Sequence, residues 1–153
     1  MTKQGLAADQ LQNLTGLIRD VLGIEGQVSG GDVVVWVGAD SLVSACSQLK
    51  KDSRLDMDYL ACLSVVDYPD HFQAVYHLFS IRLGWRLVLK VKLPRGEPNL
   101  PSLVEVWPGA TWHEREAAEM FGVHFAGHPH LVPLLLEEGF TGHPLLKSYV
   151  LPE

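Results

Sequence analysis

The densest cluster of side chains capable of acid–base chemistry is Glu114, Arg115 and Glu116, with Glu119 one helical turn beyond Arg115. On an α-helix, Arg115, Glu116 and Glu119 share one face, and Glu114 falls toward the apolar side. The favoured interpretation of Glu114 is a capping box with Thr111, in which both side chains bind free N–H groups at the start of a helix. The second interpretation is a partly buried carboxylate that engages a neighbouring basic group, and the third is a catalytic carboxylate pair.

Histidine is the other residue type that could do chemistry, because five histidines crowd the last third of the chain: His113, His124, His128, His130 and His143. One hypothesis is a stand-alone hydrolase in which Glu114 or Glu116 works with His113 or His128 as acid and base, although no nucleophile or oxyanion donor is visible near them. Another is a metal-binding module, although the histidines lack the spacing of known zinc motifs. Structural or interface use is favoured over both, which stay open as alternatives.

Cofactor-binding patterns are missing from the rest of the sequence. Cys46 and Cys62 are far apart and belong to no C-x-x-C pair, so we expect two inert core thiols, with no disulfide framework and no iron–sulfur cluster. The sequence contains no G-x-G-x-x-G and no phosphate-binding loop. We therefore expect no cofactor, metal or nucleotide site on this chain.

Two helices and a strand are predicted in the first third. Apolar residues recur at three- and four-residue intervals from Leu11 to Leu22 and indicate an amphipathic helix that ends at Gly23. Val33–Val37 follows a Gly-Gly-Asp turn and is rich in strand-forming residues. A second helix should begin after Asp40 or Ser41 and end near Lys51.

The middle of the chain predicts an antiparallel meander with strands over 60–66, 72–82 and 85–93. Three prolines in residues 94–101 predict a linker that cannot sustain a strand ladder. A helix should then run from Thr111 to about Phe121, with Gly122 as its C-terminal cap. We predict an α+β fold, an antiparallel sheet packed with helices over residues 1–125, followed by an extended irregular C-terminal arm at 126–153.

Bulk composition excludes several classes of partner. The net charge of -6 gives no electrostatic reason to bind nucleic acid or anionic lipid. The apolar runs are too short for a membrane-spanning helix. Met1–Gly5 lacks the apolar core of a signal peptide, so we expect a cytosolic location.

One segment resembles a family pattern. Residues 112–123 read W-H-E-R-E-A-A-E-M-F-G-V, similar to the W-x-E-R-E-x-x-D-M-F-G-[IV] motif of the 30 kDa-type subunit of respiratory complex I (NADH:quinone oxidoreductase), with Glu119 in place of Asp. Residues 125–131 and 142–145 resemble that family's F-x-G-H-P-x-L and G-H-P-L blocks. Val66-Asp67-Tyr68-Pro69 and the strand around residues 90–93 also follow its order.

The sequence departs from the family at charged positions of the C-terminal arm. Val132 and Pro133 stand where the family usually carries two arginines. Leu146-Lys147-Ser148-Tyr149 stands where it has R-K-D-Y. Because such charges are expected where subunits meet, the partner surface is altered, or the chain comes from a related energy-converting hydrogenase or dehydrogenase.

The resemblance implies a structural subunit without redox centres in the hydrophilic arm of a proton-translocating NADH:quinone oxidoreductase. It implies docking to the large quinone-site subunit and to iron–sulfur subunits, with NADH, FMN, iron–sulfur clusters and quinone bound by those partners. It further implies a peripheral position on the cytoplasmic side of the cell membrane, with membrane contact only through the complex.

The residues expected to form the motif and the partner interface lie in the helix and the C-terminal arm. We predict that Trp112, Arg115, Glu119, His128 and His143 hold the helix and the arm against each other or against the partner. The full set is Trp112, Glu114, Arg115, Glu116, Glu119, Phe121, Gly122, Gly127, His128, Pro129, Gly142, His143 and Pro144.

Overall fold

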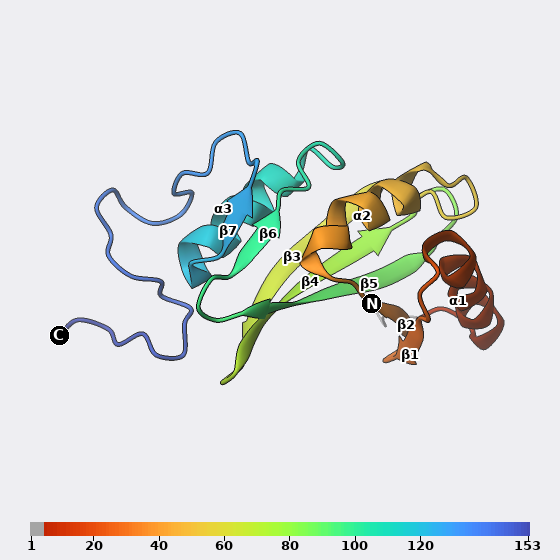
Figure 1. Ribbon diagram of the computed structural model, residues 1–153, viewed down its shortest axis with the longest axis horizontal. Coiled ribbons are helices and arrows are strands. Elements are labelled where there is room, and N and C mark those ends of the chain that lie inside the picture. Colours follow the sequence, from red (N-terminus) through yellow and green to blue (C-terminus); the bar gives the residue numbers. More distant parts are fainter. Residues whose placement is uncertain (1–4) are drawn as a thin grey trace.

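The computed structural model describes residues 5–153, and Figure 1 shows its helices lying beside one twisted sheet. Residues 1–4, on which the expectation about a signal peptide largely rests, lie outside the described residues. The elements are α1 (Ala8–Leu22), β1 (Gln27–Ser29), β2 (Asp32–Trp36), a 3-10 turn (Ala39–Ser41), α2 (Leu42–Lys51), β3 (Tyr59–Asp67), β4 (His71–Phe79), β5 (Arg86–Pro94), β6 (Asn99–Pro101), α3 (Ala110–Phe121) and β7 (His124–Ala126).

The main sheet has the strand order β1-β2-β5-β4-β3. The predicted meander is present, since β3 pairs antiparallel with β4 and β4 antiparallel with β5. The prediction of a purely antiparallel sheet is wrong in one place, because β2 pairs parallel with β5, with Val34 opposite Val88. The chain reaches this arrangement through the crossover that contains α2, which brings the later strands beside β2. The α+β class is confirmed.

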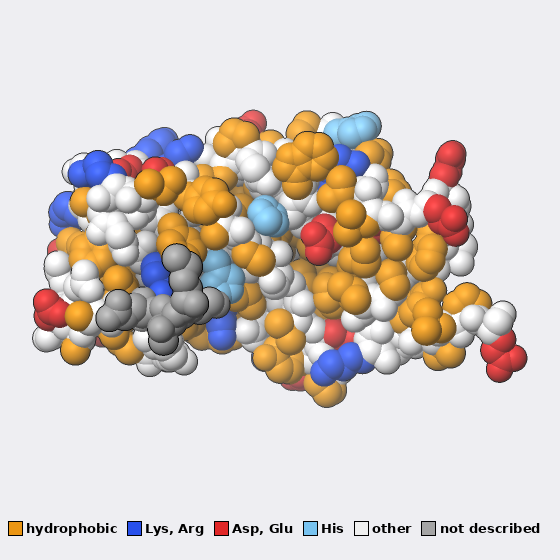
Figure 2. Space-filling model, turned by 180° about the vertical axis from the view of Figure 1, so that it is seen from behind, with side chains coloured by type: hydrophobic (Ala, Val, Ile, Leu, Met, Phe, Trp, Pro, Cys, Tyr) orange, Lys and Arg blue, Asp and Glu red, His pale blue; other side chains and the backbone are white. Residues whose placement is uncertain are grey.

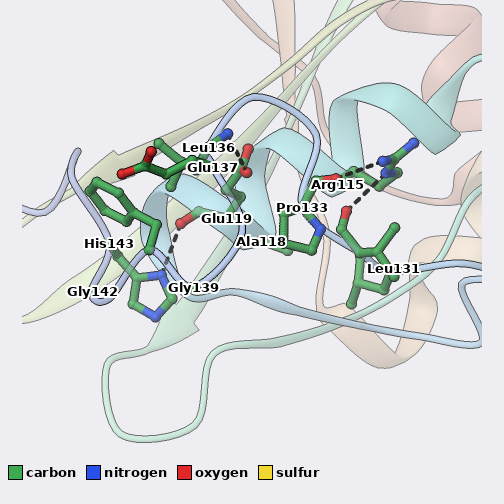
Figure 3. Close-up of a pocket in the computed structure, with 12 residues that line it drawn as sticks. Arg115, Ala118, Glu119, Leu131, Pro133, Leu136, Glu137, Gly139, Gly142 and His143 are labelled. Atoms are coloured by element: carbon green, nitrogen blue, oxygen red, sulfur yellow. Dashed lines mark hydrogen bonds between the residues drawn. The ribbon is translucent and has the colours of Figure 1, made fainter.

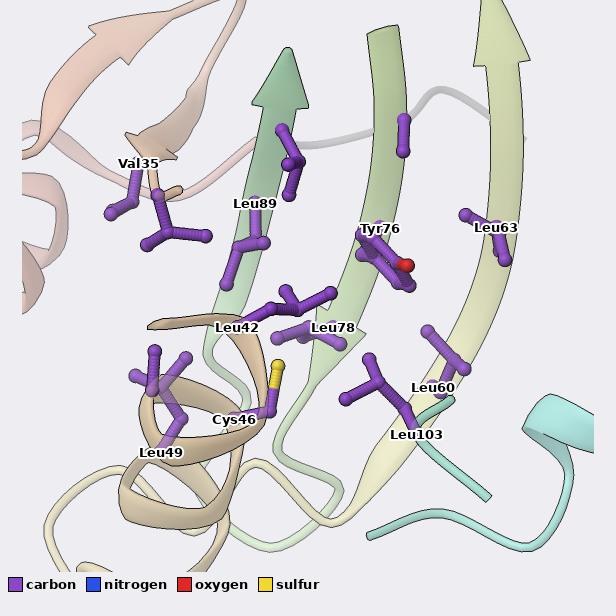
Figure 4. Close-up of a cluster of buried hydrophobic side chains, with 14 of the residues drawn as sticks. Val35, Leu42, Cys46, Leu49, Leu60, Leu63, Tyr76, Leu78, Leu89 and Leu103 are labelled. Atoms are coloured by element: carbon purple, nitrogen blue, oxygen red, sulfur yellow. The ribbon is translucent and has the colours of Figure 1, made fainter. Parts of the chain in front are cut away.

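The core lies on one face of this sheet. Inward side chains such as Val35, Tyr76 and Leu89 share one buried cluster with α2 (Figure 4), and Leu14 and Ile18 of α1 belong to the same cluster. Helix α3 reaches the same core through Ala110 and Ala117. All three helices therefore cover the same side of the sheet.

The two cysteines differ in burial. Cys46 is fully buried in α2, as expected, and burial raises the pKa of its thiol to about 12, which keeps it protonated and unreactive. Cys62 lies at an outward position of β3 and is only half-buried, with its sulfur 3.4 Å from Ser64 Oγ. The expectation of a core thiol is wrong for Cys62, because a bulge between Leu60 and Cys62 shifts the side-chain alternation of β3.

A second small sheet joins the proline-rich linker to the segment after α3. β6 pairs parallel with β7, and Leu100 lies opposite Phe125, both buried. The prediction that residues 94–101 form no ladder is therefore wrong for the last three of them, and for Pro94, which ends β5 opposite His71. Strand β6 is short and pairs on one side only, which is where proline is tolerated.

Residues 127–153 contain no helix or strand and form an irregular C-terminal arm, which runs on past α3 in Figure 1. Ala126, the predicted start of the arm, still belongs to β7. Within residues 5–153, no helix has the length and apolar character needed to cross a bilayer.

Candidate functional site

Glu114 lies in the second turn of α3, and the predicted capping box is absent. The helix begins at Ala110 with Gly109 at the N-cap, so Glu114 points into the protein rather than back to the helix start. The side chain is fully buried and accepts hydrogen bonds from Ser102 Oγ at 2.6 Å and from Leu103 N at 2.7 Å. Burial raises its pKa despite these donors. Glu114 thus fastens α3 to the chain that follows β6.

His128, at the start of the C-terminal arm, has a buried side chain beside this carboxylate. The amide of His130 can only donate, so His128 Nδ1 accepts its hydrogen bond, at 3.0 Å. His128 Nε2 then carries the proton and donates to Thr111 O at 3.2 Å, with Glu114 Oε2 4.0 Å away. These contacts fix the ring orientation and join the arm to the first turn of α3.

Arg115 binds the backbone of the arm. Its Nε donates to Val132 O at 2.9 Å, and its Nη2 donates to Pro133 O at 2.8 Å. The guanidinium also lies over the ring of Trp112, 5.3 Å from the centroid. Trp112 itself is 58% exposed, so it faces solvent rather than the arm.

Glu119 accepts hydrogen bonds from three consecutive arm amides, Leu134 N at 3.1 Å, Leu135 N at 3.0 Å and Leu136 N at 2.8 Å. Desolvation raises the pKa of the Glu119 carboxyl, but the three amides and the charge of Arg115 together lower it more, leaving it below its ordinary value. The ionised carboxylate therefore shapes this bend of the arm.

His143 completes the C-terminal end of α3. Its Nδ1 donates to Glu119 O at 2.9 Å, and Leu145 N donates to Met120 O at 3.1 Å. The arm thus binds two carbonyls that have no partner inside the helix. Gly122 adopts a φ of 76°, and a Cβ there would lie 2.8 Å from His143 Nε2, so only glycine fits this close approach.

A cleft of about 250 Å³ separates α3 from the arm, and Figure 3 shows the side chains that line it. Arg115 and Glu119 form its polar wall, and Leu131, Pro133 and Phe140 contribute apolar surface. Arm backbone groups bind both Arg115 and Glu119, and Glu137 of the arm also lines the cleft.

The remaining predicted residues have separate positions. Glu116 is exposed and lines a groove between α3, the arm residue Leu145 and the edge strand β3. Phe121 packs partly buried against the core. The others lie along the arm: Gly127 (φ 82°), Pro129, Gly142 (φ 88°) and Pro144.

Among residues 5–153, no three His, Cys, Asp or Glu side chains are grouped to hold a metal ion. The structure brings together one pair of the hydrolase hypothesis, because Glu114 Oε2 lies 4.0 Å from His128 Nε2. Both side chains are fully buried, and both oxygens of Glu114 accept structural hydrogen bonds.

Sequence reasoning missed Asp67, at the end of the edge strand β3. This buried carboxylate contacts Arg95 and accepts a hydrogen bond from Lys147 N at 2.9 Å, so it holds the far part of the arm. Arg95, the first of these partners, lowers the pKa of Asp67. The available signal was the Val66–Pro69 block of the resemblance, which carried no assigned role.

Comparison with known proteins agrees with the sequence resemblance. The family model "Respiratory-chain NADH dehydrogenase, 30 Kd subunit" matches residues 35–153. The corresponding subunit of NADH-quinone oxidoreductase from Azoarcus sp. is 37% identical over 92% of this chain and 76% of its own length. The Roseiflexus castenholzii protein of the same name is 42% identical, covering 77% of this chain and 70% of itself. The chain spans only 50% of the Nocardioides sp. relative, at 38% identity.

Two solved structures share the fold. The trypsin-resistant fragment of Nqo5 aligns with a TM-score of 0.63 at 24% identity, covering 80% of this chain and 99% of the fragment. A chain of the membrane-bound sulfane sulfur reductase, an archaeal respiratory membrane complex, aligns with a TM-score of 0.73 at 23% identity, covering 84% and 78%. The matched residues include the whole α3 and arm site, and the chain belongs to the family of the 30 kDa subunit of respiratory-chain NADH dehydrogenase.

Proposed function

We propose that this chain is a structural subunit, without redox centres of its own, in the hydrophilic arm of a proton-translocating NADH:quinone oxidoreductase. Its α3 and C-terminal arm dock against the large subunit that helps to form the quinone site, and iron–sulfur subunits lie beside it. NADH, FMN, iron–sulfur clusters and quinone bind to those partners. The chain sits peripherally on the cytoplasmic side of the membrane and meets the membrane only through the complex.

The observation that carries this proposal is that the backbone of the C-terminal arm is bound to α3 while apolar side chains of the arm are exposed. Its backbone groups at 132–136 are bound by Arg115 and Glu119, whereas apolar side chains of the arm point to solvent. Leu135 is 64% exposed, Val150 82% and Leu151 79%. Figure 2 shows hydrophobic side chains gathered over the half of the molecule that carries the arm. Exposed apolar side chains on a backbone that is fixed by hydrogen bonds are typical of a protein interface.

Charge reversal at the two residues that hold the arm tests the proposal. Arg115→Glu and Glu119→Lys should reduce the amount of intact complex on native gels far more than they lower the melting temperature of the isolated chain. Arg82→Glu is the matched control, because Arg82 is an exposed arginine paired with Asp56, outside α3 and the arm. Wild-type levels of complex in both arm variants would contradict the proposal.

A related energy-converting hydrogenase or dehydrogenase complex is the second candidate. The observation that favours it is the apolar character of Val132, Pro133 and Leu146, at positions where the family pattern described above has basic residues. Leu146 packs against the core, which explains why an apolar residue fits there. Affinity purification of the native complex separates the two candidates, because the electron-input subunits that copurify identify the enzyme.

A further inference from the structure

The sheet has a second face that no described helix covers. Outward positions on β2 and β5 alternate with the core positions, so Trp36 lies opposite Lys90, and Phe79 on β4 lies opposite Arg86. The core cluster contains Val33 and Val35 but not Val34 between them, and Val34 is buried among side chains of the other face. We call the outward side chains of β2, β3, β4 and β5 the open sheet face. Figure 2 looks from the side away from α2, where basic and histidine side chains lie among hydrophobic ones.

The open sheet face is basic, although the chain as a whole has a net charge of -6. Arg86, Lys90 and Lys92 occupy outward positions of β5. Among the described residues, Asp32 is the only carboxylate at an outward position of these four strands, and its oxygen lies 2.7 Å from Arg86. Asp70, in the turn between β3 and β4, lies near enough to Lys92 for their charges to interact, so the two lysines leave only a small surplus of positive charge on an otherwise acidic protein.

Aromatic rings hold the cations over the sheet. Lys90 Nζ lies 5.6 Å from the centroid of the Trp36 ring, and the Arg86 guanidinium lies 5.9 Å from that of Phe79. Trp36 is 41% exposed, and Tyr59 at the outer edge is 51% exposed. Exposed aromatic residues beside arginine are the composition that protein interfaces favour. Because the cations are held in place, less side-chain entropy is lost on binding.

We propose that the open sheet face is a second docking surface, occupied by an acidic surface of another subunit in the same complex. This inference rests on the proposed function. It adds a second kind of contact, with an acidic partner surface, to the apolar contact made by the arm. An anionic membrane is the weaker match, because stable lipid recognition uses about four to eight clustered basic residues. Two lysines and one paired arginine fall short of that number, but they suffice to select and orient an acidic protein surface.

Site-specific photo-crosslinking in the intact complex tests this. A photoreactive phenylalanine analogue replaces Ser64 on β3 or Gln27 on β1, both exposed and outward-facing, in cells where the variant chain is the sole copy. Gln12 on the outer side of α1 is the matched control, and Leu135 reports the arm contact. We expect Ser64 and Gln27 to capture a partner segment rich in Asp and Glu, and Gln12 to capture much less.

The outcomes separate the two proposals. If Leu135 captures a large subunit while Ser64 and Gln27 capture no protein, or only lipid, the proposed function stands and the second surface is refuted. If Leu135 also captures no subunit, the proposed function itself falls, and the second surface falls with it.

Charge variants provide an independent measure. Lys90→Glu combined with Lys92→Glu should weaken retention of the chain in the complex by about tenfold and move its release to lower salt. Lys51→Glu, at an exposed position of α2, is the control and should behave as wild type. Lys92→Glu alone, at an exposed position, covers the case in which the double variant folds poorly. Equal salt sensitivity of Lys92→Glu and Lys51→Glu would overturn the inference.

Discussion

The imidazole of His143 packs against Gly122 and fits there because glycine has no side chain. Gly122 ends α3 in the left-handed region, and the imidazole of His143 packs where a Cβ would stand. The F-G and G-H-P motifs of the sequence thus meet at one point, although Gly122 and His143 lie far apart along the chain. Sequence reasoning identified Gly122 as a cap but gave no indication that the imidazole lies against it.

Replacing Gly122 by alanine should therefore lower the free energy of unfolding by more than the strain of the left-handed backbone conformation alone. Gly127 also has a positive φ, 82°, but a Cβ there would meet nothing within 4 Å, so it is the matched control. Gly127→Ala should destabilise the chain by about 1–2 kcal/mol from left-handed strain. Gly122→Ala should lose roughly 1–3 kcal/mol more because the ring of His143 must move. Urea unfolding measures both, and equal losses would show that the close approach is unimportant.

Glu119 makes the arm contact sensitive to pH. Its pKa is lowered in the folded chain, so its stabilisation is complete above the ordinary glutamate value of about 4.3 and is lost as the pH falls through the lower folded pKa. Hydrogen exchange should show protected amides at Leu134, Leu135 and Leu136 down to about pH 4.3, and loss of protection as the pH falls further.

Glu119→Gln should lower the protection of these amides about tenfold at neutral pH, because hydrogen bonds to a charged acceptor are worth about 1–2 kcal/mol more than neutral ones. The same variant should remove the loss of amide protection at acidic pH. Unchanged protection in Glu119→Gln would mean that the arm is held by other contacts.

At the scale of elements, the position of helix starts was the hardest feature to predict. Thr111 and Glu114 have the spacing of a capping box, but the helix begins at Ala110 and the carboxylate turns inward to Ser102 and Leu103. Nothing local in the sequence distinguishes these two outcomes, because the deciding donors lie on a different segment. The parallel pairing of β2 with β5 was unpredictable for the same reason, since periodicity identifies strands but not their neighbours.

The link between α3 and the segment after β6 can be tested at Glu114. Glu114→Ala leaves the buried amide of Leu103 without an acceptor and should cost about 1–3 kcal/mol. Glu114→Gln can still accept from Leu103 and donate to Ser102 Oγ, so it should lose much less. Thermal unfolding of the two variants at neutral pH makes the comparison, and equal losses would contradict the role of the hydrogen bond.

The contribution of Glu114 to stability should depend on pH in the opposite direction to that of Glu119. Burial raises the pKa of Glu114, so the folded state favours the protonated acid, and stability should fall as the pH rises from the ordinary glutamate pKa to that raised value. Glu114→Gln should remove this decline. A wild-type stability curve indistinguishable from that of Glu114→Gln would contradict the assignment.

At the scale of the whole molecule, composition and spacing predicted the α+β class, the meander and the irregular arm, but not the course of the arm. The arm is held mainly through backbone groups, such as the amides of Leu134–Leu136 and Lys147. Every residue type except proline carries such an amide, so no sequence pattern records where they bind. Five residues were proposed from the sequence as holding the arm or the partner. Arg115, Glu119, His128 and His143 contact the arm, whereas Trp112 is exposed and contacts Arg115.

The predicted division at residues 125 and 126 can be tested by truncation. A chain that ends after Ala126 retains the strands, the three helices and the core. It should fold, with a lower melting temperature, because the carbonyls of Glu119 and Met120 lose their arm donors. Circular dichroism and heteronuclear NMR should show an intact sheet and a frayed last turn of α3. Loss of all cooperative unfolding would show that the arm belongs to the folding unit.

The contact between Asp67 and Lys147 joins residues 80 positions apart. Closing so long a loop is entropically costly and slow compared with hairpin formation, so this contact should form near the end of folding. Newly made chains would then pass through a period in which the sheet is complete while the arm is still open to proteases. A partner subunit that binds during this period would meet the arm before the arm has bound to α3. The timing of assembly would then decide whether the arm first covers α3 or the partner.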